Sequence, residues 1–251
     1  MRTLKLTLAY DGTAYAGWQA QPGCRTVQGT LEAAIEKVTG QKVRVLASGR
    51  TDAGVHALGQ VVGWQTQSEL PVETLRRALS AELPDDVVVV EAAEAADDFH
   101  ATRDAVRKLY RYVIHDGPIR DVFRRQYCWH YTRARLDAEA MHRAAQALLG
   151  THDFRSFQKS GTQRQSSVRT VFEISVRRGR GKEQDWVTLE IEGDGFLYNM
   201  VRAIVGTLVE VGRGVRPESW PVEVLRAAER SAAGPTAPPQ GLFLVRVQYD
   251  S

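Results

Sequence analysis

The order of apolar patterns in the first hundred residues is the feature that most constrains the fold of this chain. Residues 3–10 alternate strictly between polar and apolar side chains, which is typical of a half-buried strand. Thr26 is a plausible helix N-cap and Gly40 a stop signal, while Pro71 suits a first helical turn. We expect strands over residues 3–10, 43–47, 55–65 and 87–90, the last fully buried, and helices over 27–38 and 71–80. This β-α-β-β-α-β order is that of the ferredoxin-like fold.

The second half of the chain repeats the order of strands and helices without repeating the sequence. Strands are expected over residues 108–115, 170–178, 186–192 and 241–249, and helices over 137–149, 196–211 and 223–230. Residues 161–167 and 231–240 are expected to be surface loops. The predicted class is α+β, with two ferredoxin-like or RRM-like lobes, 1–105 and 106–251. Each lobe should have a mostly antiparallel sheet, and a cleft between them is the expected place for a site.

Composition indicates an ordinary globular protein of 251 residues, 43% of them hydrophobic. No run of about 18 apolar residues predicts a membrane span, and the N-terminus lacks a signal-peptide pattern. Cys24 and Cys128 are far apart and have no metal-type spacing. We therefore expect reduced thiols and a cytoplasmic location.

The charge of the chain is unevenly distributed. Residues 1–105 carry 10 basic and 14 acidic side chains, and residues 106–251 carry 23 and 16. Arginine supplies 27 of the 33 cations, and residues 155–182 hold eight basic side chains and one acid. Arginine binds phosphate through two parallel hydrogen bonds, so the second half fits contact with nucleic acid. The alternative is the preference of a GC-rich genome for arginine codons, or the charged surface of a thermophile's protein.

The run 49–57, Gly-Arg-Thr-Asp-Ala-Gly-Val-His-Ala, places an acid beside an arginine and surrounds both with glycines. Asp52 could serve as a nucleophile, a general base or an electrostatic stabiliser. Arg50 carries a planar, permanently charged fork suited to a phosphate or a base edge. A polar turn with a surface ion pair would look the same.

Three later residues are weaker candidates when taken by themselves. Tyr110 would share a strand face with Tyr112, where a tyrosine is ordinarily part of a core. Arg202 lies in an apolar helical run, and a buried charge there needs a partner unless it reaches solvent at a helix end. Leu242 reads simply as a core leucine.

Other enzyme classes lack the residues that they require. Asp11-Gly12-Thr13 follows a strand as in aspartyl-phosphate phosphatases, but the second aspartate of that motif would fall at Ala9. The chain has no His-Glu-x-x-His pair, Walker loop or Gly-x-Ser-x-Gly elbow. We expect neither a metal nor a nucleotide cofactor.

The 49–57 run resembles, nearly letter for letter, the active-site loop of the tRNA pseudouridine synthase A family. Further segments resemble that family in the same order along nearly the whole chain: 9–13, 17–19, 26–28, 98–101, 110–112, 195–202 with 205–206, and 237–238 with 241–242. The resemblance implies an isomerase that converts uridine to pseudouridine in the tRNA anticodon arm, at tRNA positions 38, 39 and 40. It also implies a homodimer that binds one tRNA across both subunits, without a cofactor.

The resemblance also implies roles for individual residues. Asp52 would be the nucleophile, although attack at C6, attack at C1′ and removal of the 2′ proton all remain open. Arg202 would pair with Asp52 and lower its pKa, and Arg50 would fill the gap left by the extruded nucleotide. Tyr110 and Leu242 would pack on opposite sides of the target uracil.

Two alternatives remain open at this point. A non-catalytic tRNA-binding or chaperone protein on the same scaffold would bind tRNA without needing Asp52. A carboxylate-dependent hydrolase would turn over free nucleotides and would show no salt-sensitive binding of RNA.

Overall fold

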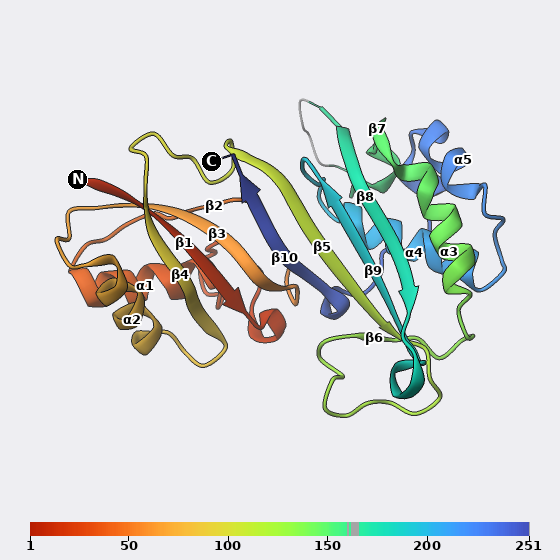
Figure 1. Cartoon of the computed structure of the whole chain (residues 1–251), viewed down its shortest axis with the longest axis horizontal. Helices are drawn as coiled ribbons and strands as arrows, with labels where there is room; N and C mark the ends of the chain where they lie inside the picture. Colours follow the sequence, from red (N-terminus) through yellow and green to blue (C-terminus); the bar gives the residue numbers. More distant parts are fainter. Residues whose placement is uncertain (160, 162–165, 251) are drawn as a thin grey trace. The chain divides into compact units, whose positions relative to one another are not determined.

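The protein divides into two compact units, seen in a computed structural model that describes residues 1–159, 161 and 166–250 (Figure 1). The first unit comprises residues 1–106 and 243–251, and the second comprises residues 107–242. Residues 243–251, which the sequence suggested would belong to the second lobe, group with the first. The physical reason is a parallel pairing in which Phe243 lies opposite His56 and Leu244 opposite Ala57.

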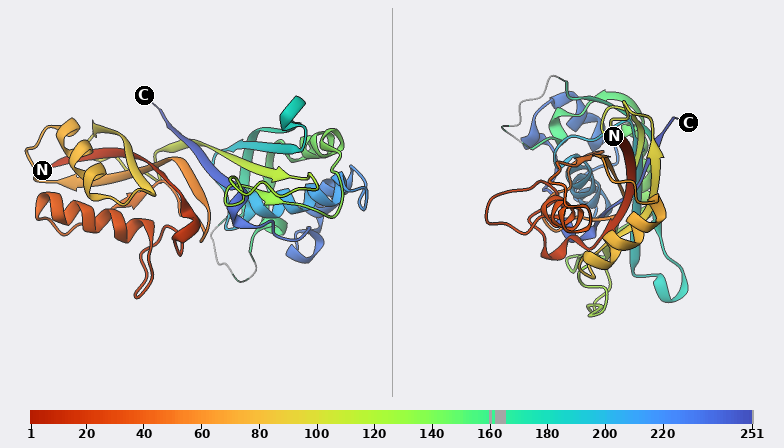
Figure 2. Two further views of the ribbon diagram at one scale, coloured as in Figure 1. Left: turned by 90° about the horizontal axis from the view of Figure 1, so that it is seen from below. Right: turned by 90° about the vertical axis from the view of Figure 1, so that its left-hand side faces the viewer.

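The first unit is a sheet with two helices. Its strands follow the order β4-β1-β3-β10, and the two-residue β2 pairs with β3. The elements are β1 (Arg2–Tyr10), β2 (Leu46–Ala47), β3 (His56–Thr66), β4 (Val87–Ala95), β10 (Leu242–Tyr249), α1 (Val27–Thr39) and α2 (Val72–Glu82), with a short 3₁₀ turn, η1 (Gly12–Ala14). β1 is antiparallel to both β3 and β4. Figure 2 shows α1 running along one side of this sheet.

Apolar alternation places one face of β1 in the core, as predicted. Leu4, Leu6 and Leu8 are completely buried, whereas Lys5 and Thr7 on the other face are half-buried. The predicted helix signals of α1 are also confirmed. Thr26 accepts a hydrogen bond from the amide of Gly29, and Gly40 ends the helix with a left-handed φ of 71°.

The expectation of a fully buried strand over residues 87–90 is wrong. Val87 and Val89 are buried, but Val88 and Val90 are 42% and 52% exposed. β4 packs on α2, and its valines alternate between buried and exposed, so only one of its two faces meets the core. A short valine run does not distinguish a strand buried on both faces from a strand buried on one face.

The second unit is an antiparallel sheet packed with three helices. Its strand order is β5-β9-β8-β7, and β6 pairs with β5 in parallel. The elements are β5 (Ala105–His115), β6 (Trp129–His130), β7 (Gly150–Asp153), β8 (Val168–Arg178), β9 (Trp186–Gly193), α3 (Ala138–Ala145), α4 (Met200–Gly212) and α5 (Trp220–Ala227). The 3₁₀ turns are η2 (Gln146–Leu148), η3 (Arg155–Phe157), η4 (Gly181–Glu183), η5 (Arg230–Ala232) and η6 (Pro239–Gly241).

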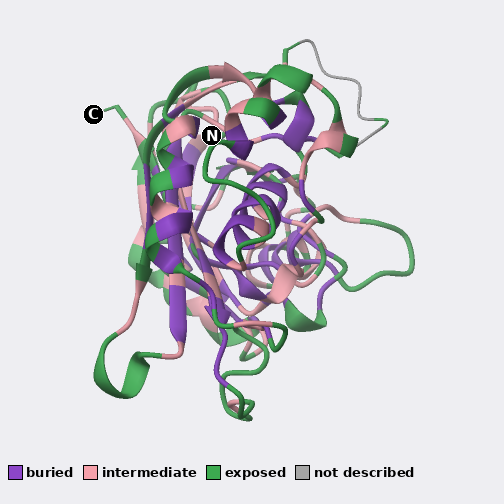
Figure 3. Cartoon of the chain, turned by 90° about the vertical axis from the view of Figure 1, so that its right-hand side faces the viewer, coloured by how far each residue is buried: buried purple, intermediate pink, exposed green. Residues whose placement is uncertain are grey.

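α4 supplies much of the second core. Eleven of its thirteen residues are buried, and buried segments are purple in Figure 3. The helix begins at Met200 instead of residue 196, because Asn199 adopts a left-handed φ of 65° that a helix cannot include. The turn that precedes α4 is therefore a distinct local structure and not a first helical turn.

The mixed α/β class and the mostly antiparallel strands are confirmed. The ferredoxin-like pattern of each lobe and the cleft between them stay predictions. In the part of the chain that the structure describes, no helix combines the length and the apolar character needed to cross a bilayer. The expected loop over 161–167 falls largely outside the described residues.

Candidate active site

The loop that joins β2 to β3 carries Arg50 and Asp52, and its first residues are hydrogen-bonded to β3. The amide of Ser48 donates to the carbonyl of Val61 over 2.8 Å, and its hydroxyl donates to Oε1 of Gln60 over 2.7 Å. Nε2 of Gln60 then donates to the carbonyl of Gly49 over 2.9 Å. Ser48 and Gln60 are both fully buried, so the start of the loop has one fixed position.

Thr51, the residue before Asp52, is bound on both its side chain and its main chain. Its Oγ1 lies 2.8 Å from the hydroxyl of Tyr10, at the end of β1. Its carbonyl accepts a hydrogen bond of 3.0 Å from the amide of Trp18. Burial raises the pKa of Tyr10 to about 12, so this tyrosine stays protonated at neutral pH.

Two glycines of the N-terminal segment allow that segment to lie directly against the loop. A Cβ on Gly17 would stand 2.8 Å from the carbonyl oxygen of Thr51 and 3.2 Å from the carbonyl carbon of Asp52, and its φ is +94°. A Cβ on Gly12 would stand 2.0 Å from the carbonyl oxygen of Val55. No side chain fits at either position without moving the loop backbone.

The end of the loop is fixed by His56, which is 1% exposed. Its Nδ1 accepts from the amide of Gly12 over 3.1 Å and lies 3.1 Å from Oδ1 of Asp11. The amide of Val55 closes a turn by donating to the carbonyl of Asp52 over 3.1 Å. Asp11 and Gly12, which resembled a phosphatase motif, therefore support the Asp52 loop.

This framework leaves two side chains of different exposure on the loop. Asp52 is half-buried and Arg50 is exposed. A half-buried carboxylate on a fixed backbone suits chemistry on a bound substrate, because little reorganisation is needed when the substrate arrives.

Arg202 is the third residue of α4, in the second unit, and its guanidinium is held from two sides. Nε donates to the carbonyl of Ala237 over 2.7 Å, and Nη1 donates to Oδ1 of Asn199 over 3.1 Å. The main chains of Arg202 and Ala237 are also hydrogen-bonded, since the amide of Ala237 donates to the carbonyl of Arg202 over 3.0 Å. Arg202 is half-buried, which agrees with the expectation that this arginine has partners.

The segment that holds Arg202 was expected to be a surface loop, and that expectation is wrong for Gly234 and Ala237, which are buried. Residues 231–240 pack on α4, with Gly234 and Ala237 buried. The amide of Gly234 donates to Oγ1 of Thr207 over 2.9 Å. A Cβ on Gly206 would stand 1.7 Å from the carbonyl oxygen of Pro235. At Gly234 and Ala237 the small side chains allow a close approach of backbones, while Ser231 and Pro235 are exposed.

Tyr110 and Tyr112 lie on the same face of β5 in different environments. Tyr110 is half-buried and meets Phe196 edge to face, with ring centroids 5.1 Å apart. Tyr112 is fully buried and donates from its hydroxyl to the carbonyl of Pro238 over 2.7 Å. Burial raises the pKa of Tyr112 well above its ordinary value. Leu242, which begins β10, is 6% exposed.

The structure thus places Arg50 and Asp52 on one loop of the first unit, and Tyr110, Arg202 and Leu242 in the second unit. Their catalytic and binding roles stay predictions. Sequence reasoning missed the supporting residues Tyr10, Thr51, Asn199 and Ala237. All four lie in segments that resemble the family, but nothing in the sequence indicated their contacts, because hydrogen bonds between distant segments leave no periodic signal.

No metal centre emerges among the described residues, where no group of three or more His, Cys, Asp or Glu side chains could hold an ion.

Comparison with known proteins identifies the class of protein. The family model for tRNA pseudouridine synthase matches residues 7–103 and 144–250. A tRNA pseudouridine synthase A of Moorella thermoacetica is 49% identical over 252 residues, which cover 99% of this chain and 100% of the relative. One of Thermoanaerobacter sp. (strain X514) is 46% identical over 249 residues, with the same coverage. The solved Cbf5-Nop10-Gar1 complex gives a TM-score of 0.37 at 12% identity, over 82% of this chain and 54% of that one, which is too distant to define the fold.

The chain belongs to the tRNA pseudouridine synthase family and is an isomerase. The family match covers both the Asp52 loop and the segments around Arg202 and Leu242. The family resemblance expected from the sequence is confirmed.

Proposed function

We propose that this enzyme isomerises uridine to pseudouridine in the anticodon arm of tRNA, at tRNA positions 38, 39 and 40. The observation that carries the proposal is the fixed backbone around Asp52, within a chain of this family. A set of hydrogen bonds and two glycine contacts hold the loop on both sides of that carboxylate. Such support is what a reacting group needs to meet its substrate in one orientation.

The reaction is an internal exchange of bonds. The glycosidic bond between C1′ and N1 breaks, the detached uracil turns, and C5 bonds to C1′. C5 loses its proton and N1 gains one, so product and substrate have the same atoms. Asp52 is the nucleophile in this proposal, and attack at C6, attack at C1′ and removal of the 2′ proton are the pathways that would use its carboxylate.

Four other side chains assist Asp52 in the proposal. Arg202, already held by Ala237 and Asn199, keeps the carboxylate ionised. Tyr110 stacks on the uracil, and Leu242 packs against its other side. Arg50 is exposed and fills the stack after the nucleotide has been extruded, which offsets part of the cost of unstacking.

The proposal also covers the location and the oligomeric state of the enzyme. It acts in the cytoplasm, on tRNA, as a homodimer in which one tRNA contacts both subunits. The net positive charge of residues 106–251 supports contact with an RNA backbone.

Mapping the modified positions tests this function. Unmodified tRNAs with uridine at only one of positions 38, 39 and 40 are incubated with the enzyme, and pseudouridine is located by mass spectrometry after nuclease digestion. The proposal expects pseudouridine at each of the three positions and none in tRNAs with cytidine there. Pseudouridine confined to another arm would contradict the assigned target, and tight binding without any pseudouridine would favour a binding protein.

A further inference from the structure

The loop over residues 117–127 presents apolar side chains to solvent. Phe123 is 89% exposed, Ile119 is 81% exposed and Val122 is 55% exposed. Single exposed apolar residues are ordinary, but three within five positions form a patch, and such patches mark interaction sites. The family model leaves this loop unmatched, since it covers residues 7–103 and 144–250.

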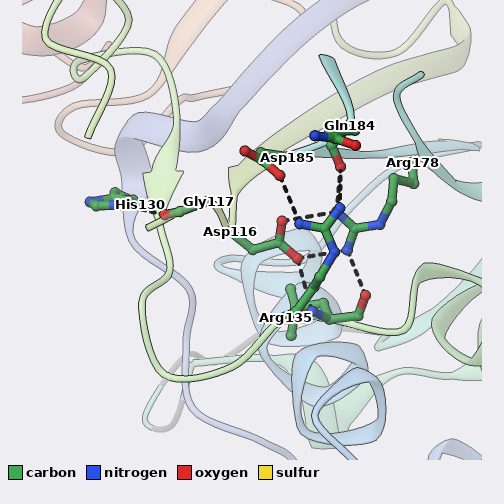
Figure 4. Close-up of polar contacts among 8 residues, drawn as sticks. Asp116, Gly117, His130, Arg135, Arg178, Gln184 and Asp185 are labelled. Carbon is green, nitrogen blue, oxygen red and sulfur yellow. Dashed lines mark hydrogen bonds and ion pairs between the residues drawn. The ribbon is translucent and has the colours of Figure 1, made fainter. Parts of the chain in front are cut away.

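Buried ion pairs hold the two ends of the chain segment that contains this loop (Figure 4). Asp116, just before the loop, receives hydrogen bonds of 2.9 and 2.6 Å from the guanidinium of Arg178. The same carboxylate accepts from the amide of Leu136 over 2.8 Å, and Arg178 donates to the carbonyl of Leu136 over 2.5 Å. Residues 116 and 136 are therefore tied to one arginine of β8.

A second set of contacts strengthens the same base. Arg135 pairs with Asp185 over 2.7 Å, and the amide of Asp116 donates to the carbonyl of Asp185 over 2.9 Å. Nε2 of His130 lies 3.0 Å from the carbonyl of Gly117. Figure 4 shows Asp116, Arg135, Arg178 and Asp185 gathered in one cluster, with His130 and Gly117 to one side of it.

The tip of the loop is organised by Asp121. Its Oδ1 accepts hydrogen bonds of 2.9 Å from the amides of Phe123 and Arg124, and its Oδ2 accepts one of 2.8 Å from Nε of Arg124. Arg124 also pairs with Glu183 over 3.1 Å and lies 3.8 Å above the ring of Trp186. The amide of Phe123 is thus fixed while its ring stays in solvent.

Two more arginines lie within three residues of Phe123 in the sequence. Arg120 and Arg125 are exposed, and within the described residues neither has a carboxylate at ion-pair distance. The guanidinium of Arg125 donates to the carbonyl of Val122, which holds it beside the apolar patch. The tip therefore combines an exposed aromatic ring with two cations that no acid neutralises.

We infer that the 117–127 loop is an RNA-binding site outside the catalytic residues, at which Phe123 stacks on an unpaired base of the tRNA and Arg120 and Arg125 bind its phosphates. Aromatic rings and arginines are the groups that bind single-stranded nucleotides in RNA. Because the loop is already ordered, binding loses little conformational freedom. The inference rests on the proposed tRNA substrate.

The charge of the tip favours RNA over a second copy of this chain. Residues 117–127 carry three arginines and one aspartate, and that aspartate is used within the loop by Arg124. Two such tips related by a two-fold axis would bring like charges together, which is unfavourable. RNA supplies both the phosphates and the base faces that the tip lacks.

Steady-state kinetics on full-length tRNA test the inference with Phe123→Ala and with the double variant R120Q/R125Q. Phe123→Ala should raise KM roughly tenfold, as expected for the loss of one stacked base, and kcat should not change. The double variant should make the dependence of log Kd on log salt shallower by about two. Val215→Ala and Arg226→Gln, exposed positions of the same unit, are the matched controls and should behave as the native enzyme.

Circular dichroism and light scattering complete the test. The exposed side chains should leave the fold and the molar mass unchanged, and a variant that loses oligomers would assign the patch to a second copy and overturn the inference. An unchanged KM and salt slope would overturn it as well. If the native enzyme binds tRNA but forms no pseudouridine, while Phe123→Ala weakens that binding, the proposed function fails and the RNA site stands.

Discussion

The hydroxyl of Tyr10 and the hydroxyl of Thr51 lie 2.8 Å apart in the interior of the first unit. This hydrogen bond joins the end of β1 to the residue beside the proposed nucleophile, across 41 positions of sequence. Tyr10 is 5% exposed and Thr51 is 6% exposed. Neither hydroxyl can turn to water if the other is removed, so the contact fixes the position of the Asp52 backbone.

Removing one of these hydroxyls should therefore lower turnover with little effect on tRNA binding. Tyr10→Phe keeps the ring and should lower kcat roughly tenfold through a small displacement of the loop. Thr51→Val removes one of the two side-chain partners of the buried tyrosine hydroxyl, since Gln60 is the other, and should lower the free energy of unfolding by about 1 kcal/mol. The double variant should lose less than the sum of the two single variants, as measured by kinetics and urea unfolding. Strictly additive effects would contradict the coupling.

The second prediction concerns the glycine beneath the loop. Gly17→Ala would place a Cβ 2.8 Å from the carbonyl oxygen of Thr51 and would also strain a φ of +94°. Gly23→Ala is the matched control, because Gly23 has a φ of +72° and open space around it. Both variants should lose about 1 kcal/mol from backbone strain. Gly17→Ala alone should lose further stability and most of its activity, and equal effects in both would rule out the steric argument.

The contacts of Gly17 and Tyr10 also show what the sequence could not supply. The ends of α1 were predicted correctly. Thr26 precedes its first residue and Gly40 follows its last, since capping depends on neighbouring residues. The 49–57 run likewise marked a loop, which the structure places between β2 and β3. The partners of that loop come from β1 and the segment after it, and no local pattern encodes which distant backbone they touch.

The errors have the same origin. The valines over 87–90 were expected to be fully buried, but burial depends on whether one or both faces of the sheet are covered, which is a property of the whole fold. Residues 231–240 have the composition of a loop, yet Gly234 and Ala237 are buried against α4. Small residues allow either solvent exposure or close packing, and only the tertiary structure distinguishes the two.

The third prediction is a dependence of stability on pH that comes from Asp116. Burial acts to raise the pKa of this carboxyl, but the hydrogen bonds from Arg178 and from the Leu136 amide outweigh burial and hold the pKa below its ordinary value. A depressed pKa adds stability above the unfolded value of about 3.9, and that stability is lost as the pH falls through the folded value. Asp116→Asn should cost roughly 3 kcal/mol at pH 7.

Urea unfolding from pH 7 down to pH 3 measures this dependence. The native protein should lose stability steeply from about pH 4 downward, and Asp116→Asn should lose less over the same range. Asp85→Asn, at an exposed position, is the control and should follow the native curve. If the free energy of unfolding fell equally with pH in the native protein and in Asp116→Asn, this ion pair would be excluded as the source of the pH dependence.

The fourth prediction concerns the two thiols. Cys24 is exposed and Cys128 is buried, and burial raises the pKa of Cys128 to about 11. The thiolate is the reactive form, so a disulfide reagent at pH 8 should modify one thiol of the folded protein quickly. The second thiol should react only in denaturant. Cys24→Ser should abolish the fast phase, and its persistence would show that Cys128 is accessible.

The central claim, that the Asp52 carboxylate performs the isomerisation, is tested most directly by tritium release. tRNA carrying uridine labelled with tritium at C5 is incubated with the native enzyme, with Asp52→Ala and with Asp85→Ala, and tRNA affinity is measured in parallel. C5 must lose its hydrogen when it becomes the glycosidic carbon. The account predicts release by the native enzyme and by Asp85→Ala, and no release by Asp52→Ala although it still binds tRNA. Release by Asp52→Ala at the native rate would contradict it.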